Sequence, residues 1–262
     1  MQIVFLAVMF VLGAAMGSFL TCQSWRYHLW DQKKKSPGKW SVCMRCKQRL
    51  KWYDNVPIVS WILLRGKCRY CGKGIGVAEI LAEVLMALSF LGLGIVADFS
   101  QHTDPAWWGN LAIMLALIIS LGFLAIYDGM WGELPVFALI LSGVIALAIF
   151  VLRIVSGFEM MQIWDTVGGI AILGGLYLVL YLASKGKWVG DGDWILGAIL
   201  ALALGSSWLS LIVLFLANFL GTVIMYPLVK NKKSHKIYFG PFLVIGFVIA
   251  LVFSEQFLAL LS

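Results

Sequence analysis

Long apolar runs constrain this chain more than any other feature of its sequence. Hydrophobic residues make up 61% of the 262 residues and charged residues only 13%, a balance that a soluble globular domain does not show. A helix needs about 20 apolar residues to cross a bilayer, so we expect an all-α, polytopic membrane protein with about eight transmembrane helices. The expected segments are residues 3–22, 79–97, 110–127, 134–153, 166–184, 194–204, 208–229 and 240–261.

The first and sixth of these runs differ from the others. The first has no basic residues before it and is long enough to span, so it is expected to be a membrane helix and not a cleavable signal peptide. The run at 194–204 is too short to cross ~30 Å of hydrocarbon unaided.

Basic residues gather on one side of this topology. Thirteen of the 20 Lys and Arg lie between Arg26 and Lys73, and six more lie in 185–187 and 230–236, which leaves only Arg153 for the opposite side. An excess of basic residues marks the cytoplasmic loops of membrane proteins, so the amino terminus is expected outside. The net charge of +7 therefore reflects orientation in the lipid bilayer, and we expect no nucleic-acid partner.

The one sizeable polar segment carries two Cys-x-x-Cys pairs. Cys43 is followed by Cys46, and Cys68 by Cys71, a spacing that predicts a four-thiolate zinc site. So short a segment has little core of its own, so metal binding would supply folding energy. The expected domains are a first membrane helix at 1–22, a cytoplasmic zinc-binding loop domain at 23–78 and a transmembrane core at 79–262.

Two other interpretations of these cysteines are open, a pair of disulfides or four unrelated thiols. A cytoplasmic location argues against disulfides, because that compartment is reducing. Four thiolates leave no open coordination position, so the predicted zinc is structural and not catalytic.

Two carboxylates interrupt the apolar core where one run ends and the next begins. Asp128 lies in the polar stretch 127–135, and Asp193 closes a Gly-Asp-Gly-Asp sequence. An ionisable group at membrane depth costs about 2.5–3.5 kcal/mol even by insertion scales, so it indicates function. Both are expected on the cytoplasmic side. They predict an aspartic catalytic pair, one member ionised and the other protonated, because like charges a few ångströms apart do not both ionise.

The residues around Asp193 favour this interpretation. Gly190 and Gly192 would let the backbone turn tightly and approach an extended peptide. The alternative is that Asp128 and Asp193 only cap helices, since Asp is favoured at helix amino termini.

A further carboxylate lies near the cytoplasmic end of the second predicted helix. Glu83 is four residues from Glu79, so the two share a helix face. Two interpretations of Glu83 stay open. It contributes to the site or contacts substrate, or it is an interfacial carboxylate paired with a loop Lys or Arg.

In these features the chain resembles the type IV prepilin peptidases, aspartic membrane proteases of the GxGD class. The ordered set of matching features extends over most of the chain, which makes it more specific than a lone GxGD. It consists of Gly17-Ser18-Phe19 with Arg26, the two Cys-x-x-Cys pairs, Trp52 to Pro57, Ser60-Trp61, Arg65 to Gly72, Glu83, Asp128 with Pro135, Gly190 to Asp193, and Phe239 to Phe242.

This resemblance implies an activity and a location. Such enzymes lie in the bacterial cytoplasmic (inner) membrane and cut the leader from type IV prepilins and type II secretion pseudopilins at its cytoplasmic face. Many also methylate the new terminal amine with S-adenosylmethionine. When the family's motifs are matched to this sequence, the resemblance implies that Asp128 and Asp193 are the catalytic residues. Asp191 occupies the variable position of GxGD, so it is expected to be at most a modulator that raises the proton affinity of the pair.

Other functions remain open beside this one. A GxGD protease could act on another leader, such as that of a preflagellin-like protein. A proton- or ion-coupled transporter could use the same aspartates, although its acidic residues would be expected in mid-membrane and its halves would be related by a repeat. A non-enzymatic assembly factor docking through the zinc loop would keep its function without Asp128.

Overall fold

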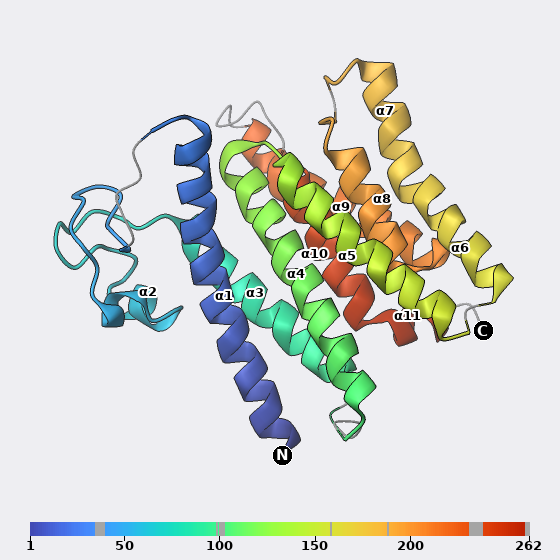
Figure 1. Cartoon of the computed structure of the whole chain (residues 1–262). Helices are drawn as coiled ribbons and strands as arrows, with labels where there is room; N and C mark the ends of the chain where they lie inside the picture. The colour runs from blue at the N-terminus through green and yellow to red at the C-terminus, as the bar shows by residue number, and fades with distance from the viewer. Residues whose placement is uncertain are drawn as a thin grey trace. The chain divides into compact units, whose positions relative to one another are not determined.

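The computed structural model is helical in the parts of the chain that it describes (Figure 1). The chain divides into two compact units, Met1–Asp104 and Pro105–Ser262. The described residues are 1–34, 40–97, 99, 103–157, 159–187, 189–230 and 238–259, with the backbone alone described for 225–230.

The first unit is built on two long helices that pack along small residues. These are α1 (Gln2–Asp31) and α3 (Val77–Val96), which lie side by side in Figure 1. A Cβ placed on Gly17 would lie 2.6 Å from the carbonyl oxygen of Ala82, and Gly13 is equally crowded by α3. Small residues at such an interface let membrane helices approach closely.

The polar segment between these helices begins later than the sequence predicts. α1 continues past the predicted end at residue 22 as far as Asp31, because no Gly or Pro interrupts residues 23–31. Among its described residues the loop holds a 3-10 turn, η1 (Trp52–Asn55), and a short helix, α2 (Val59–Leu63). It also has two isolated antiparallel β-bridges, Val42 with Arg49 and Lys67 with Gly74.

The second unit is a bundle of helices that are mostly membrane-length. The segment Met160–Ser184 is one continuous helical path with a π-helical turn, η3, inside it. The helices are α4 (Pro105–Trp131), α5 (Val136–Val155), α6 (Met160–Ile170), η3 (Ala171–Gly175), α7 (Leu176–Ser184), α8 (Asp193–Leu204), α9 (Ser207–Lys230), α10 (Gly240–Val252) and α11 (Ser254–Ala259).

The short helix α8 lies at the centre of this second unit. It contacts α5, α6, η3, α7, α9 and α10, and Leu196 and Leu200 on it are fully buried. A Cβ on Gly197 would lie 2.8 Å from the carbonyl oxygen of Leu173, so η3 and α8 are in backbone contact. At 1.5 Å per residue α8 is about 18 Å long, shorter than the hydrocarbon layer.

The predicted all-helical, polytopic architecture is confirmed. Six helices in the described part of the chain are long and apolar enough to cross a membrane, and α8 and α10 are shorter apolar helices. Together they correspond to the eight runs that the sequence analysis names.

Several predicted helix ends differ from the structure, and two of the differences lie in the second unit near its polar stretch and its last helix. α4 extends to Trp131, so Asp128 lies inside a helix and does not follow one. The predicted helix 240–261 instead breaks after α10, and α11 starts at Ser254. The indole N–H of Trp208 donates to the carbonyl oxygen of Phe257 at 3.0 Å, which ties α11 to α9.

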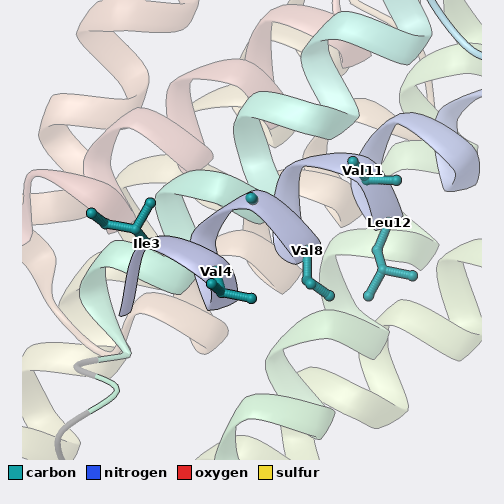
Figure 2. Close-up of a pocket in the computed structure, with 6 residues that line it drawn as sticks. Ile3, Val4, Val8, Val11 and Leu12 are labelled. Carbon is teal, nitrogen blue, oxygen red and sulfur yellow. The ribbon is translucent and has the colours of Figure 1, made fainter. Parts of the chain in front are cut away.

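A shallow apolar pocket lies along α1 (Figure 2). All of its lining side chains are aliphatic, so it offers no group for catalysis and suits contact with lipid chains. It is lined by Ile3, Val4, Ala7, Val8, Val11 and Leu12.

Candidate functional site

The cysteines of the two Cys-x-x-Cys pairs lie together in the first unit. Their sulfur atoms are all within 4.8 Å of one another, and those of Cys43 and Cys71 are 4.0 Å apart. Four sulfurs at a Zn–S distance of 2.3 Å in a tetrahedron would be separated by roughly 3.8 Å. The cluster formed by Cys43, Cys46, Cys68 and Cys71 can therefore hold a metal ion, as its spacing predicts.

The two knuckles that present these sulfurs are built alike. In the first, the N–H of Lys47 donates to the carbonyl oxygen of Cys43, and in the second the N–H of Gly72 donates to that of Cys68, both at 2.9 Å. The residue after each second cysteine has a positive φ, 61° for Lys47 and 67° for Gly72. Glycine adopts this conformation without the steric cost that a side chain brings.

The thiol of Cys43 has a lowered pKa, which favours the thiolate that binds metal ions. Burial acts to raise its pKa, but hydrogen bonds from the backbone N–H groups of Cys46 and Arg45 and from neighbouring thiols lower it to about 7. Thiolates are the form that binds metal ions, so the fold favours the ligand state.

Asp54 joins the loop between the knuckles to the second knuckle. Its carboxylate accepts hydrogen bonds from Arg69 Nε at 2.7 Å, the Tyr70 hydroxyl at 2.9 Å and the Lys51 backbone N–H at 3.1 Å. The Asp54 side chain is only 3% exposed. Burial acts to raise the pKa of Asp54, and these hydrogen bonds outweigh burial and lower it. This role of Asp54 was not predicted from the sequence, where the residue is only one member of the Trp52 to Pro57 motif.

Glu83 points its carboxylate at the loop. Its Oε2 accepts the backbone N–H of Ile58 at 2.7 Å, and the Ser18 hydroxyl also bonds to it. Neither a loop Lys nor an Arg pairs with Glu83 within the described residues. Glu83 therefore joins α1, α3 and the start of α2.

The backbone that Glu83 holds is in an unusual conformation. Ile58 has φ 62° and ψ −52°, and the N–H of Val59 donates to the carbonyl oxygen of Pro57 at 2.6 Å, which makes a γ-turn centred on Ile58. A β-branched residue with positive φ is strained and persists only where its surroundings hold it.

In the second unit, Asp128 lies in the last turn of α4 and is 5% exposed. Its Oδ2 accepts the backbone N–H of Gly240, the first residue of α10, at 2.9 Å. A Cβ on Gly240 would lie 2.8 Å from that oxygen, so only glycine lets the donor come this close. Asp128 does not cap the helix to which it belongs, because it lies at the carboxyl end of α4.

Asp193 is the first residue of α8 and is 7% exposed. Its Oδ2 accepts the backbone N–H of Gly190 at 2.9 Å, which closes the Gly-Asp-Gly-Asp turn on itself. Asp191, between them, is exposed and interacts electrostatically with Asp193.

The structure brings the two polar stretches of this unit together. The carboxylates of Asp128 and Asp193 are near enough to interact electrostatically. A Cβ on Gly192 would lie 2.8 Å from Leu134 Cδ1, so the turn before α8 packs directly on the linker between α4 and α5. Two short segments that are distant in sequence thus form one site.

The start of α10 is the third part of this site. The ring of Tyr238 lies against Gly132, which has φ 73° and no room for a Cβ, and Pro241 lies beside Gly129. The ring of Phe239 packs on that of Tyr177 with centroids 5.3 Å apart. From the sequence, residues 239–242 entered only through the family resemblance, and no role was predicted for Tyr177. Tyr177 could have been singled out because it is a polar aromatic residue inside an apolar run.

One prediction concerns the carboxylate of Asp54. Since its pKa is lowered in the folded protein, its contribution to stability is present above the unfolded value of about 3.9 and is lost as pH falls through the folded pKa. Asp54→Asn should lower the Tm at pH 7 by roughly 2–4 °C. At low pH the Tm values of the variant and the wild type should lie closer together, because Asp54 of the wild type is then protonated. Thermal unfolding in detergent at several pH values measures this; an equal difference at every pH would contradict it.

A second prediction concerns Glu83 and the strained turn. Glu83→Ala removes the acceptor for the Ile58 N–H, so amide hydrogen exchange around residues 57–60 should accelerate about tenfold or more, as expected when a hydrogen bond worth about 1.5–3 kcal/mol is lost. Glu83→Gln keeps an acceptor oxygen and is the matched control, with exchange closer to wild type. Equal exchange in wild type and Glu83→Ala would mean that other contacts hold the turn.

Comparisons with known proteins show what this chain is similar to. A family model described as the bacterial peptidase A24 N-terminal domain matches residues 11–97. The prepilin leader peptidase/N-methyltransferase of Pectobacterium carotovorum subsp. carotovorum is 31% identical over 236 residues, which cover 87% of this chain and 76% of the relative. Proteins of the same name from Dichelobacter nodosus and Dickeya chrysanthemi are 29% and 27% identical, covering 82% and 95% of this chain and 72% and 93% of theirs. No solved structure matches. The chain therefore belongs to the prepilin leader peptidase/N-methyltransferase family.

Proposed function

We propose that this chain is a membrane aspartic endopeptidase that removes the leader peptides of type IV prepilins and type II secretion pseudopilins, with Asp128 and Asp193 as its catalytic pair. The observation that supports this most is the pairing of two buried carboxylates, each held through one oxygen by a backbone N–H. Each carboxylate thereby keeps its other oxygen for a proton or a water molecule.

This arrangement supports a general acid–base hydrolysis. A water molecule between the carboxylates gives a proton to the ionised one as its oxygen bonds to the peptide carbonyl carbon, while the protonated one gives its proton to the carbonyl oxygen. The tetrahedral intermediate then collapses. The C–N bond breaks, its electron pair passes to nitrogen, and that nitrogen takes a proton from the carboxylic acid formed in the first step. One hydroxyl of the intermediate returns its proton to the other carboxylate and becomes the carbonyl oxygen of the new carboxyl group, which restores the starting protonation of the pair.

The remaining parts of the proposal concern placement. We place the protein in the bacterial inner membrane with its amino terminus outside and the catalytic pair at the cytoplasmic face, because basic residues concentrate in the loops on that side. We place the metal-binding loop domain within residues 23–78, of which those up to Asp31 continue α1, and the protease core within 79–262. Gly190 and Gly192 shape the turn before Asp193, Asp191 modulates the pair, and Glu83 holds the loop of the first unit at Ile58.

We assign structural zinc to the cluster of Cys43, Cys46, Cys68 and Cys71. The sulfur separations fit a tetrahedral ion, and four thiolates fill its coordination shell. Zinc would supply a fixed centre to a loop that has little helix of its own among its described residues.

We extend the proposal to N-methylation of the new terminal amine, because relatives that cover most of the chain carry this activity in their names. S-adenosylmethionine would supply the methyl group. Residues 23–77 contain no glycine-rich nucleotide loop, so we assign no residues to this cofactor.

The test of the peptidase is cleavage of a prepilin in membranes containing the full chain. Asp128→Asn and Asp193→Asn should each lower the rate at least 10²- to 10⁴-fold, the range for losing a general acid or base. Glu133→Gln changes an exposed carboxylate in the same polar stretch and should cut normally.

Other outcomes of that assay separate the alternatives. Normal cleavage by either Asp variant would remove that residue from the catalytic pair. Cleavage of a preflagellin-like leader and not of a prepilin would change the substrate, and no cleavage by wild type together with proton-coupled transport would favour a transporter.

A separate prediction concerns the metal. Purified wild-type protein should contain one zinc per chain, because one cluster of four thiols is available. Cys68→Ser should lose most of this zinc and unfold at a lower temperature, whereas Cys22→Ser, which changes a cysteine outside the cluster, should keep it. Metal analysis with thermal unfolding measures both, and zinc retained by Cys68→Ser would contradict the assignment.

A further inference from the structure

Tyr177 is a buried polar side chain that the hydrolysis described above does not use. It is 2% exposed and lies in the first turn of α7, directly after the π-helical turn η3. A π-helical turn adds a residue to the helix and re-aims the side chains that follow, and such turns occur often at functional sites.

Tyr177 lies at nearly the same depth as Asp193. η3 and α8 are in contact where Gly174 faces Ala198, and the chain reverses direction between α7 and α8. Tyr177 is three residues from Gly174 toward that reversal, and Asp193 is five residues from Ala198 toward it. At 1.5 Å per residue, their depths differ by roughly 3 Å. Tyr177 and Asp193 also interact electrostatically.

The Tyr177 hydroxyl is oriented by Asn218 on α9. The Asn218 side-chain amide donates to the Tyr177 oxygen at 3.1 Å and to the carbonyl oxygen of Leu214 at 2.7 Å. The phenol oxygen is therefore an acceptor in this contact, and its own O–H remains available as a donor. Within the described residues that O–H has no acceptor, and a buried donor without an acceptor is unfavourable.

The aromatic ring of Tyr177 reaches the part of the site that holds Asp128. It packs on Phe239, and the next residue, Gly240, donates its N–H to Asp128. Tyr177 thus interacts electrostatically with Asp193, and its ring packs on the residue that precedes the backbone donor to Asp128. Asp128, Asp193 and Tyr177 are all buried, so an opening that admits a peptide to the carboxylates would expose the hydroxyl as well.

We propose that the Tyr177 hydroxyl, held by Asn218, donates a hydrogen bond to the carbonyl oxygen of the scissile peptide bond. This proposal rests on the proposed function of Asp128 and Asp193. As water adds to the carbonyl carbon, the carbonyl oxygen gains negative charge before the protonated aspartate protonates it. Tyr177 stabilises that charge and keeps its own proton throughout, so the proton balance of the hydrolysis is unchanged.

The experiment compares Tyr177→Phe with wild type in detergent, using a purified prepilin as substrate. This change removes only the hydroxyl and keeps the ring that packs on Phe239. We expect kcat to fall on the order of 10²-fold with KM changed less than about threefold, as for loss of one donor to a developing oxyanion. Tyr181→Phe, one turn further along α7, is the matched control and should keep the wild-type kcat.

A structural role would give a different result. In an Asp128→Asn background, which binds substrate without cutting it, adding Tyr177→Phe should leave the Kd for the prepilin unchanged. A Kd weakened in parallel with the loss of kcat would overturn the proposal, because the hydroxyl would then serve ground-state binding or folding.

The remaining outcomes separate this proposal from the peptidase assignment. A wild-type kcat in Tyr177→Phe, together with an inactive Asp128→Asn, would overturn the role proposed for Tyr177 and leave the assignment of the catalytic pair unchanged. Cleavage by Asp128→Asn would remove the catalytic pair itself. If Tyr177→Phe does not accumulate, the same kinetic assay is carried out with Asn218→Leu, which removes the hydrogen bond to the Tyr177 oxygen. A reduced kcat at unchanged KM would support the proposal, and a wild-type kcat would overturn it.

Discussion

Burying two carboxylates in an apolar bundle is the constraint on which the unit Pro105–Ser262 depends. A carboxylate removed from water is costly unless hydrogen-bond donors replace the solvent. The fold gives each aspartate one backbone N–H, from Gly240 to Asp128 and from Gly190 to Asp193. The first of these donors is 112 residues away in sequence, so α10 has to begin against the end of α4 for Asp128 to be accommodated.

Close backbone approach makes this arrangement possible, and it explains why glycine occupies particular positions. Gly240 has no room for a Cβ beside Asp128, and Gly192 has none beside Leu134. Through these contacts the end of α4, the turn before α8 and the start of α10 fix one another. The glycine contacts between η3 and α8 extend the same close packing into the bundle and bring Tyr177 to the depth of Asp193.

The polar loop of the first unit also depends on hydrogen bonds to carboxylates. It has few buried apolar side chains, so these hydrogen bonds and the thiol cluster stabilise it. Asp54 connects the chain between the knuckles to the second knuckle, and Glu83 holds the strained turn at Ile58. In both units, then, partly or fully buried carboxylates accept hydrogen bonds from backbone N–H groups.

The sequence by itself determined the class of this protein, because hydropathy and period along the chain are local properties. It predicted the helical membrane architecture, the cysteine cluster and the pairing of Asp128 with Asp193 as candidates. Only the tertiary structure decided what depends on contacts between distant segments. The Gly240 N–H on Asp128, the Arg69 and Tyr70 side chains on Asp54 and the Asn218 amide on Tyr177 each join residues from different segments. No local pattern specifies such pairs, since they arise from the packing of whole helices.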